Sequence, residues 1–176
     1  MSFGLPHNDK QQGPAKPFKS GMAPRGCRRV GHDKFGQWSS SVMNTDFGSN
    51  SQVVQDIRAI LLPTYDIAHI CLNVEAAEAE LPLICSGVLE TNQSSGLGSN
   101  AGLPPLERRV PQAVIFGGGL PDDLVDRVKA AVLSKAPDVK PIQISREEIF
   151  AAGATGPDPE VIARLLRAKL AEQLSI

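Results

Sequence analysis

The sequence predicts an α/β fold: a small three-layer domain with a mostly parallel sheet of three to four strands, comparable to half of a Rossmann-like or flavodoxin-like fold. Short apolar runs alternate with helical segments along residues 50–176, and this alternation is typical of parallel sheets. The runs at 65–72 and 113–116 are apolar at almost every position, which indicates strands covered by helices on both faces. A chain of 176 residues has room for one such domain and a tail.

Residues 1–49 are predicted to form a disordered basic tail that precedes a single domain over 50–176. The first fifty residues carry seven basic and three acidic side chains, and four prolines and seven glycines interrupt every apolar pattern. Such a segment cannot bury enough surface to offset the entropy of ordering. Early acidic residues argue against a transit peptide, and no apolar run typical of a secretory signal follows Met1.

The domain is predicted to begin with a helix and a buried strand. The helix starts near Ser51 and ends before Pro63, because the residue that precedes a proline is disfavoured in helical conformation. Its apolar residues recur at intervals of three and four, as an amphipathic helix requires. They are Val53, Val54, Ile57, Ile60 and Leu61. The strand covers residues 65–72.

A second helix is predicted over residues 73–81, with Asn73 as its N-cap. We expect Pro82 to interrupt this helix, because proline lacks the amide hydrogen that a helix interior uses. Residues 83–85 are then a candidate for a fourth, short buried strand. Residues 86–106 are rich in Asn, Ser, Gly and Pro and are predicted to be a flexible loop.

The remainder alternates strand and helix again. After the strand at 113–116, a helix begins at Pro121, and a second strand is expected over 139–145. Pro141 cannot donate to a ladder, which places that strand at a sheet edge. Two helix starts are marked by capping residues. They are Ser145 with Glu148, and Asp158 with Pro159.

Three confident strands make a thin sheet with exposed edges, which proteins normally pair or cover. Three explanations remain open. A further strand lies within residues 25–45, a second chain completes the sheet, or the domain is incomplete.

The glycines Gly117, Gly118 and Gly119 between a strand and a helix are the candidate cofactor-binding residues. In nucleotide-binding α/β proteins such glycines bring main-chain amides close to a phosphate at a helix N-terminus. The segment lacks the dinucleotide-binding spacing and the P-loop lysine. Asp122 and Asp123 also occupy the first helical turn, where a phosphate would be repelled. A tight structural turn is therefore the favoured interpretation.

His69 and Cys71 are the one candidate pair for nucleophilic catalysis. On a strand they share a face with side chains roughly 7 Å apart, which is too far for the contact required. We therefore expect a core histidine, no catalytic residues and no metal site. The other histidines, His7 and His32, fall in the predicted tail, and Cys27 with the two remaining cysteines makes no disulfide scaffold.

Other charged residues predict no site. Glu75, Glu78 and Glu80 are expected to form the solvated face of one helix, and the pair Arg108 and Arg109 is either an anion contact or an ordinary surface pair. A net charge of −1 argues against a dedicated nucleic-acid binder. No apolar run approaches the ~18 residues of a membrane-spanning helix.

The chain has two resemblances to known proteins. The segments 61–67 and 114–121, with the helix at 75–82, resemble parts of response-regulator receiver domains. However, Gly117 or Gly118 stands where the phosphoacceptor aspartate of that family would be, so the resemblance implies that phosphoryl chemistry is lost. Residues 50–174 are similar to small uncharacterised fungal α/β proteins, some of which lie among secondary-metabolism genes. This second resemblance implies an auxiliary role.

The sequence thus predicts a non-catalytic interaction or auxiliary module, accessory to a fungal biosynthetic pathway, that binds a protein partner or forms a homo-oligomer in the cytoplasm. We expect no nucleic acid, membrane or cofactor among its partners. The alternative is a nucleotide- or phosphate-binding protein, or a small oxidoreductase-like enzyme, that uses the glycine turn.

Overall fold

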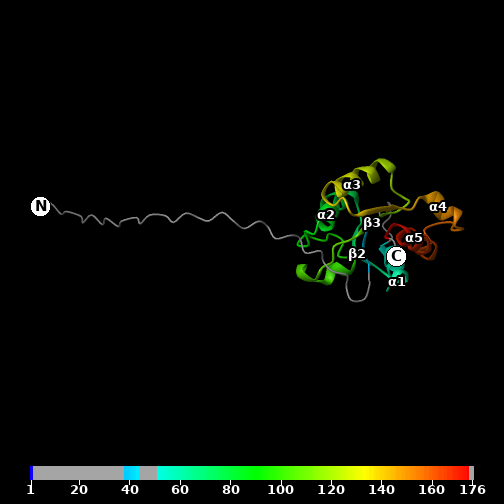
Figure 1. The fold of residues 1–176 in the computed structure, drawn as a ribbon, viewed down its shortest axis with the longest axis horizontal. Coiled ribbons are helices and arrows are strands. Elements are labelled where there is room, and N and C mark those ends of the chain that lie inside the picture. The colour runs from blue at the N-terminus through cyan, green and yellow to red at the C-terminus, as the bar shows by residue number, and fades with distance from the viewer. Residues whose placement is uncertain (2–37, 44–50, 175–176) are drawn as a thin grey trace. The chain divides into compact units, whose positions relative to one another are not determined.

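The computed structural model describes residues 1, 38–43 and 51–174, which form an α/β domain (Figure 1). One parallel sheet has the strand order β2-β1-β3-β4. Its strands are β1 (Trp38–Met43), β2 (Tyr65–Cys71), β3 (Ala113–Phe116) and β4 (Lys140–Gln143). The helices are α1 (Ser51–Leu61), α2 (Val74–Cys85), α3 (Asp122–Lys135), α4 (Arg146–Ala151) and α5 (Pro159–Leu174). The α/β class and the parallel sheet agree with the sequence-based prediction.

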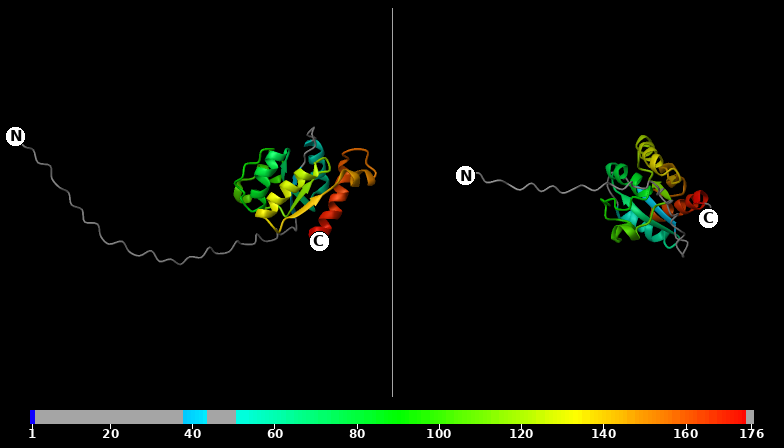
Figure 2. Two further views of the ribbon diagram at one scale, coloured as in Figure 1. Left: turned by 90° about the horizontal axis from the view of Figure 1, so that it is seen from above. Right: turned by 60° about the vertical axis from the view of Figure 1, so that its left-hand side comes forward.

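The sheet is the middle of three layers (Figures 1 and 2). Helices α1 and α5 pack together on one face, and α2 and α3 pack together on the other. Each face has its own apolar core. The first contains Val54, Ile57, Leu61, Ile67, Ile115, Leu166 and Leu170, and the second contains Cys71, Ala77, Leu81, Val114, Phe116, Val125 and Val128. Burial of one helix stripe in each core explains why the 3.6-residue pattern was readable in the sequence.

Strand β1 lies within residues 1–49, which the sequence predicted to be a disordered tail, and for Trp38–Met43 that prediction is wrong. β1 is paired on one side with β2 and on the other with β3. Its sequence, with Ser39, Ser40 and Ser41 in succession, has neither an apolar run nor an alternating pattern, so local sequence gives no strand signal. Hydrogen bonding to two flanking strands defines this strand instead. The other residues of the predicted tail lie outside the described residues.

Helix α2 continues through Pro82 to Cys85, so the predicted interruption and the candidate strand at 83–85 are both wrong. Proline in a helix costs about 3 kcal/mol through its missing amide hydrogen and its clash with the preceding turn. Leu81 and Ile84 on either side of it are fully buried. Burial of each such side chain contributes about 1.5–3 kcal/mol, so packing against the sheet offsets the cost of the proline.

Strand β4 lies at an edge of the sheet, where Pro141 is tolerated. The amides of Lys140 and Ile144 donate to the Gln112 and Phe116 carbonyls on the β3 side. Residues that donate to one neighbour alternate along a strand, so the nitrogen of Pro141 faces away from β3. The predicted edge position and its physical reason are both confirmed.

Three predicted helix caps are present. Asn73 accepts a hydrogen bond from the Ala76 amide, and Ser145 and Glu148 form a reciprocal capping box. The Asp158 carboxylate accepts from the amides of Glu160 and Val161 at the start of α5. These local hydrogen bonds join residues two or three positions apart, which is why sequence alone locates them.

The segment 86–106 is folded against the sheet, although its composition predicted a flexible loop. It contains two short 3₁₀ helices, η1 (Ser99–Gly102) and η2 (Pro105–Glu107). Asn100 is fully buried, donates to the Arg109 carbonyl at 2.8 Å and accepts from the Arg109 amide at 2.9 Å. The guanidinium of Arg108 donates to the carbonyls of three loop residues, Leu89, Thr91 and Leu103. The loop therefore has a specific hydrogen-bonded structure.

This loop covers the outer edge of β2. The Ser95 hydroxyl donates to the Ile70 carbonyl, and the Ser99 hydroxyl donates to the Asp66 carboxylate. Between them Gly98, at φ +97°, approaches β2 so closely that an added Cβ would lie 2.6 Å from the Ala68 carbonyl oxygen. β2 is an edge strand, and an uncovered edge is a template for pairing with another chain. The loop occupies that edge.

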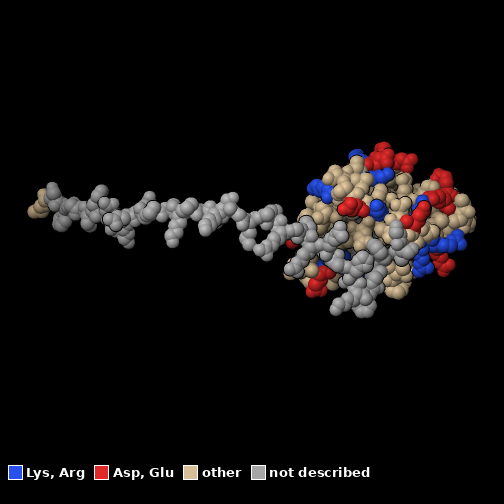
Figure 3. Space-filling model, in the orientation of Figure 1, with Lys and Arg blue, Asp and Glu red and all other residues tan. Residues whose placement is uncertain are grey.

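None of the helices among the described residues is long and apolar enough to cross a membrane. On the face drawn in Figure 3, basic and acidic side chains of the described residues are interspersed. That face therefore carries no extended patch of one charge.

Replacement of Gly98 by Ala is expected to lower the free energy of unfolding by about 2 kcal/mol or more, because alanine is strained at positive φ and its Cβ would meet the β2 backbone. Gly102→Ala is the matched control, since open space surrounds that position and its φ is unstrained. Urea unfolding of both variants measures the difference. Equal stability of the two variants would contradict the close docking of the loop on β2.

Glu148→Gln is expected to destabilise the domain at neutral pH but not in acid. A hydrogen bond from Lys169 and another from the Ser145 amide lower the pKa of Glu148, so its stabilising contribution is present above its unfolded pKa and is lost as the pH falls through the folded value. The carboxylate is partly exposed, so solvent screening limits the loss to about 1 kcal/mol or less. Urea unfolding at about pH 7 and about pH 3 measures it. Glu172→Gln, on the exposed side of α5, is the control, and a pH-independent effect of Glu148→Gln would contradict the prediction.

Candidate functional site

The glycine turn lies at the carboxyl edge of the sheet, between β3 and α3, where ligands of open α/β proteins bind. Pro121 is the N-cap residue of α3 and supplies no side-chain hydrogen bond to the first turn. The Asp122 carboxylate accepts a hydrogen bond from the side-chain amide of Gln143 at 3.2 Å. A phosphate here would meet the negative charges of both Asp122 and Asp123, as the sequence indicated.

Packing accounts for the central glycine of this turn. A Cβ on Gly118 would lie 2.7 Å from the Arg146 amide nitrogen and 2.9 Å from the Ile144 carbonyl oxygen. Gly118 therefore allows the β3–α3 turn to contact the β4–α4 turn backbone to backbone. This contact supports the interpretation as a structural turn. The assignment of Gly117, Gly118 and Gly119 as cofactor-binding residues stays a prediction.

The structure brings His69 and Cys71 together, and the expected separation of about 7 Å was wrong. Cys71 Sγ lies 3.3 Å from His69 Nε2. The spacing of about 7 Å applies to the Cβ atoms of residues two apart on a strand. The imidazole ring of His69 extends beyond its Cβ atom and leans along the strand toward Cys71. Both side chains are fully buried.

A β-bulge in β2 sets the direction of this pair. Ser40 and Ser41 of β1 pair with Ile67 and His69, so Ala68 is the extra residue of β2. A bulge shifts the alternation of side chains along the strand that carries it. Cys71 accordingly belongs to the core on the α2 and α3 face, whereas Ile67 belongs to the opposite core.

Glu80 of α2 completes a buried cluster that we call the HCE cluster, formed by His69, Cys71 and Glu80. Glu80 Oε2 lies 2.8 Å from His69 Nε2, and Glu80 Oε1 accepts a hydrogen bond from the Ser94 amide at 3.1 Å. Glu80 is 6% exposed, so the expectation that it lies on a solvated face is wrong. Glu75 is exposed as expected, and Glu78 pairs with Arg127 at the surface.

A sequence signal for Glu80 did exist. It stands four residues after Ala76, three after Ala77 and four before Ile84, and all three are buried residues of α2. At helical spacing these positions share one face, so Glu80 falls on the buried stripe. Because Glu80 follows Glu75 and Glu78 closely in sequence, it was grouped with them on the solvated face.

Burial shifts the pKa values of His69 and Cys71 in the HCE cluster. It lowers the pKa of His69, although hydrogen bonding with Gln93 and the charge of Glu80 act in the opposite direction. Burial, followed by the negative charge of Glu80 and by Cys85, raises the pKa of Cys71 well above its usual range. A thiol that stays protonated and inaccessible is a poor nucleophile, so this geometry does not favour Cys–His catalysis.

Asp66 and the two arginines have structural contacts. Asp66 is 3% exposed, and its carboxylate lies 3.6 Å from Arg58 Nε and 3.5 Å from Arg109 Nη1. Arg108 donates to main-chain carbonyls of the loop. Fixation of the loop by Arg108 is a third role, which neither interpretation of the arginine pair anticipated.

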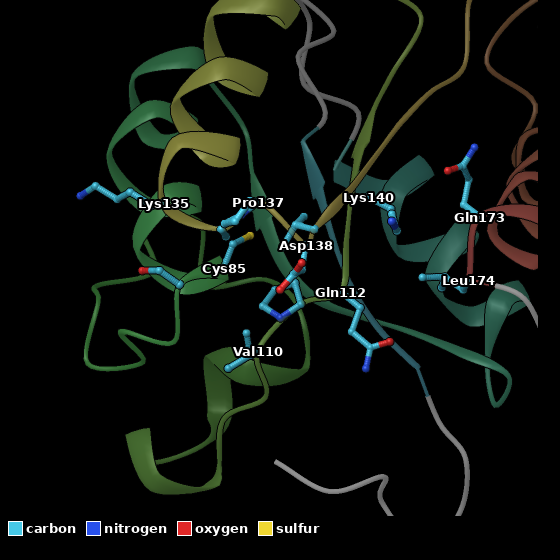
Figure 4. Close-up of a pocket in the computed structure, with 13 residues that line it drawn as sticks. Cys85, Val110, Gln112, Lys135, Pro137, Asp138, Lys140, Gln173 and Leu174 are labelled. Atoms are coloured by element: carbon cyan, nitrogen blue, oxygen red, sulfur yellow. The ribbon is translucent and has the colours of Figure 1, made fainter. Parts of the chain in front are cut away.

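A groove of about 630 Å³ lies at the opposite, amino edge of the sheet (Figure 4). Segments before β3 and β4 line it together with the ends of α2 and α5. These residues include Cys85, Val110, Pro111, Gln112, Lys135, Asp138, Lys140 and Leu174. Gln112, Lys135, Asp138 and Lys140 are solvent exposed, and burial raises the pKa of Cys85 to about 12. The Cys85 thiol of the lining is therefore a poor nucleophile.

Fold and contacts thus define a small α/β protein with a parallel sheet, a tightly docked loop and a buried polar cluster. The chain is similar to Kojic acid related protein 6 of Aspergillus oryzae, with 27% identity over 95 residues. The match covers 54% of this chain and 52% of the relative, so it spans about half the length of that protein. It confirms the resemblance to a small fungal protein. No protein-family model and no solved structure matches the chain.

Gly118→Ala is expected to lower the free energy of unfolding by about 1–3 kcal/mol in the absence of any ligand, because its Cβ would force apart two backbone turns. Gly156→Ala, with open space around it, is the control. In the same thermal-shift assay, ADP and NAD are expected to leave the melting temperature of the wild-type chain unchanged. A rise of several degrees with either nucleotide would show a binding site and contradict the purely structural turn.

Proposed function

We propose that this chain is a non-catalytic α/β module that acts by self-association or by binding a partner protein. The observation that carries the proposal is that polar side chains suited to chemistry are buried, whereas apolar side chains of the loop are exposed. The polar groups suited to acid–base chemistry, above all His69 and Glu80, are buried and contact β2, α2 and the loop. The loop presents apolar side chains outward instead.

Two of the exposed large apolar residues lie on this loop segment. Leu106 on η2 is 97% exposed, and Val88, just after α2, is 43% exposed. A Cβ on Gly87 would contact Val110, which lines the amino-edge groove, so Val88 adjoins that groove. Arg108 fixes the backbone on both sides of the loop. Exposed apolar side chains on a rigid support beside a groove are a suitable arrangement for a protein contact.

The relative supports the accessory part of the proposal. Its name associates that protein with kojic acid. We extend this to the present chain as a cytoplasmic accessory role in a fungal biosynthetic pathway. Deletion of its gene is then expected to change a metabolite profile without removal of a catalytic step.

The direct test is the molar mass of the full chain in light scattering, measured over a range of concentrations. We expect a defined oligomer whose dissociation constant rises at least about tenfold in Leu106→Glu, which corresponds to about 1.4 kcal/mol. Phe150→Glu on α4 is the matched control, because Phe150 is also an exposed apolar residue, 50% accessible, but lies on another element.

If the chain is a monomer at every concentration, self-association is excluded and the proposal then requires a partner protein. Affinity purification from the source organism then compares the wild-type chain with the same two variants. A protein retained by the wild type and by Phe150→Glu but lost by Leu106→Glu supports the proposal. No partner that depends on Leu106 would overturn it.

The second candidate is a nucleotide- or phosphate-binding protein that uses Gly117, Gly118 and Gly119. What favours it is the position of the turn at the carboxyl edge of the sheet and the absence of a side-chain cap at the start of α3. The thermal-shift measurement with ADP and NAD distinguishes this candidate from the first.

A further inference from the structure

Three ligand-type atoms of the HCE cluster converge on one point in the core. One ligand atom each from His69, Cys71 and Glu80 lies within 4.8 Å of the other two. Nε2 is 3.3 Å from the sulfur and 2.8 Å from the carboxylate oxygen. Each residue is at least nine-tenths buried, so bulk water does not solvate these atoms.

Two acceptor atoms share one imidazole nitrogen in this arrangement. A neutral imidazole has at Nε2 either one proton or one lone pair. With the proton present, Nε2 donates to Glu80 Oε2, and the sulfur of Cys71, a weak acceptor, faces the same proton. A metal ion in place of that proton would contact all three atoms.

Several polar atoms near the cluster have no partner in strict hydrogen-bond geometry. Among the described residues these are His69 Nδ1, both side-chain amide atoms of Gln93, and Glu80 Oε2, which has His69 Nε2 at 2.8 Å as its one close polar contact. Nδ1 points away from Nε2, and the Gln93 side chain acts on His69 from outside the converging atoms. An ion at the converging atoms would therefore supply a second partner to Glu80 Oε2.

Charge leads to the same conclusion. Glu80 is a buried acidic residue of the cluster, and a buried carboxylate is stabilised by a nearby cation. Arg108, whose positive charge reaches His69, directs its guanidinium to the main-chain carbonyls of the loop. A divalent cation at the centre of the HCE cluster would compensate Glu80 directly.

We propose that His69 Nε2, Cys71 Sγ and Glu80 Oε2 bind one Zn²⁺ ion. Nitrogen, sulfur and carboxylate oxygen are the three donor types that zinc takes in proteins. On binding, the Cys71 thiol releases its proton to solvent, so thiolate, carboxylate and Zn²⁺ together are neutral. Tetrahedral zinc with ordinary bond lengths separates such donors by about 3.4–3.6 Å. Nε2 and the sulfur, 3.3 Å apart, nearly match this, whereas Nε2 and Oε2, 2.8 Å apart, must separate by about 0.6 Å on binding. Water takes the fourth position.

The site would join three parts of the chain that are distant in sequence. His69 and Cys71 belong to β2, Glu80 belongs to α2, and Glu80 also accepts the Ser94 amide of the loop. Zinc would thus stabilise the cover of the β2 edge. Because a buried site binds metal in the folded state, its binding free energy adds to folding stability. The proposal is independent of the protein-interaction function.

The test uses Co²⁺ as a spectroscopic substitute for zinc on the full chain, with Cys27→Ser as background because Cys27 lies outside the described residues. We expect one Co²⁺ per chain, intense visible absorption of a tetrahedral ion and a thiolate-to-metal charge-transfer band in the near ultraviolet. Zn²⁺ is expected to displace Co²⁺ and to raise the melting temperature, and a chelator is expected to reverse that rise.

Matched variants locate the ligands. Cys71→Ser should abolish the charge-transfer band, whereas Cys85→Ser, which alters the other buried free cysteine, should keep it. If Cys71→Ser does not fold, Glu80→Gln replaces it and should weaken Co²⁺ binding at least about tenfold. Absence of stoichiometric metal from the wild-type chain, or a band that survives Cys71→Ser, would overturn the proposal, as would unchanged Co²⁺ affinity in Glu80→Gln.

Discussion

The docking of the loop on the outer edge of β2 is the constraint on which the rest of the structure depends. A parallel edge strand exposes unpaired amides and carbonyls, and these must be covered or paired. Here the cover is built from Ser95, Gly98 and Ser99, which contact three successive parts of β2. The close approach at Gly98 leaves no room for a side chain, so the loop has one position along the strand.

Buried polar groups follow from that docking. A loop that crosses a strand brings its own amides and carbonyls under cover, and each needs a partner. Asn100 satisfies both main-chain groups of Arg109, Glu80 accepts from Ser94, and Arg108 satisfies three carbonyls. These polar residues, which in the sequence alone could suggest a functional site, therefore form the hydrogen bonds that hold the loop in place. In the HCE cluster a nitrogen, a sulfur and an oxygen converge within the core, and this convergence motivates the proposed zinc site.

The two edges of the sheet consequently differ in character. At the carboxyl edge Gly118 brings two backbone turns into contact, and the aspartates of α3 give the turn negative charge. At the amino edge the ends of α2 and α5 and the segments before β3 and β4 line a groove. A partner bound at the amino edge would not disturb the hydrogen bonds between the loop, β2 and Glu80, because those hydrogen bonds lie inside the domain.

Sequence by itself determined the features that depend on neighbours within one or two helical turns. The apolar runs of β2 and β3, the stripe of α1, the caps at Asn73, Ser145 and Asp158, and the edge position of Pro141 were all readable, since periodicity and local hydrogen bonds are recorded in adjacent residues. Tertiary structure decided the rest. β1 is a strand because two other strands flank it, Pro82 stays helical because its neighbours are buried, and residues 86–106 are ordered because an edge needs cover. The HCE cluster likewise forms only when a bulge at Ala68 and the inward face of α2 bring together residues that the chain separates, and distances between elements are not encoded in any local pattern.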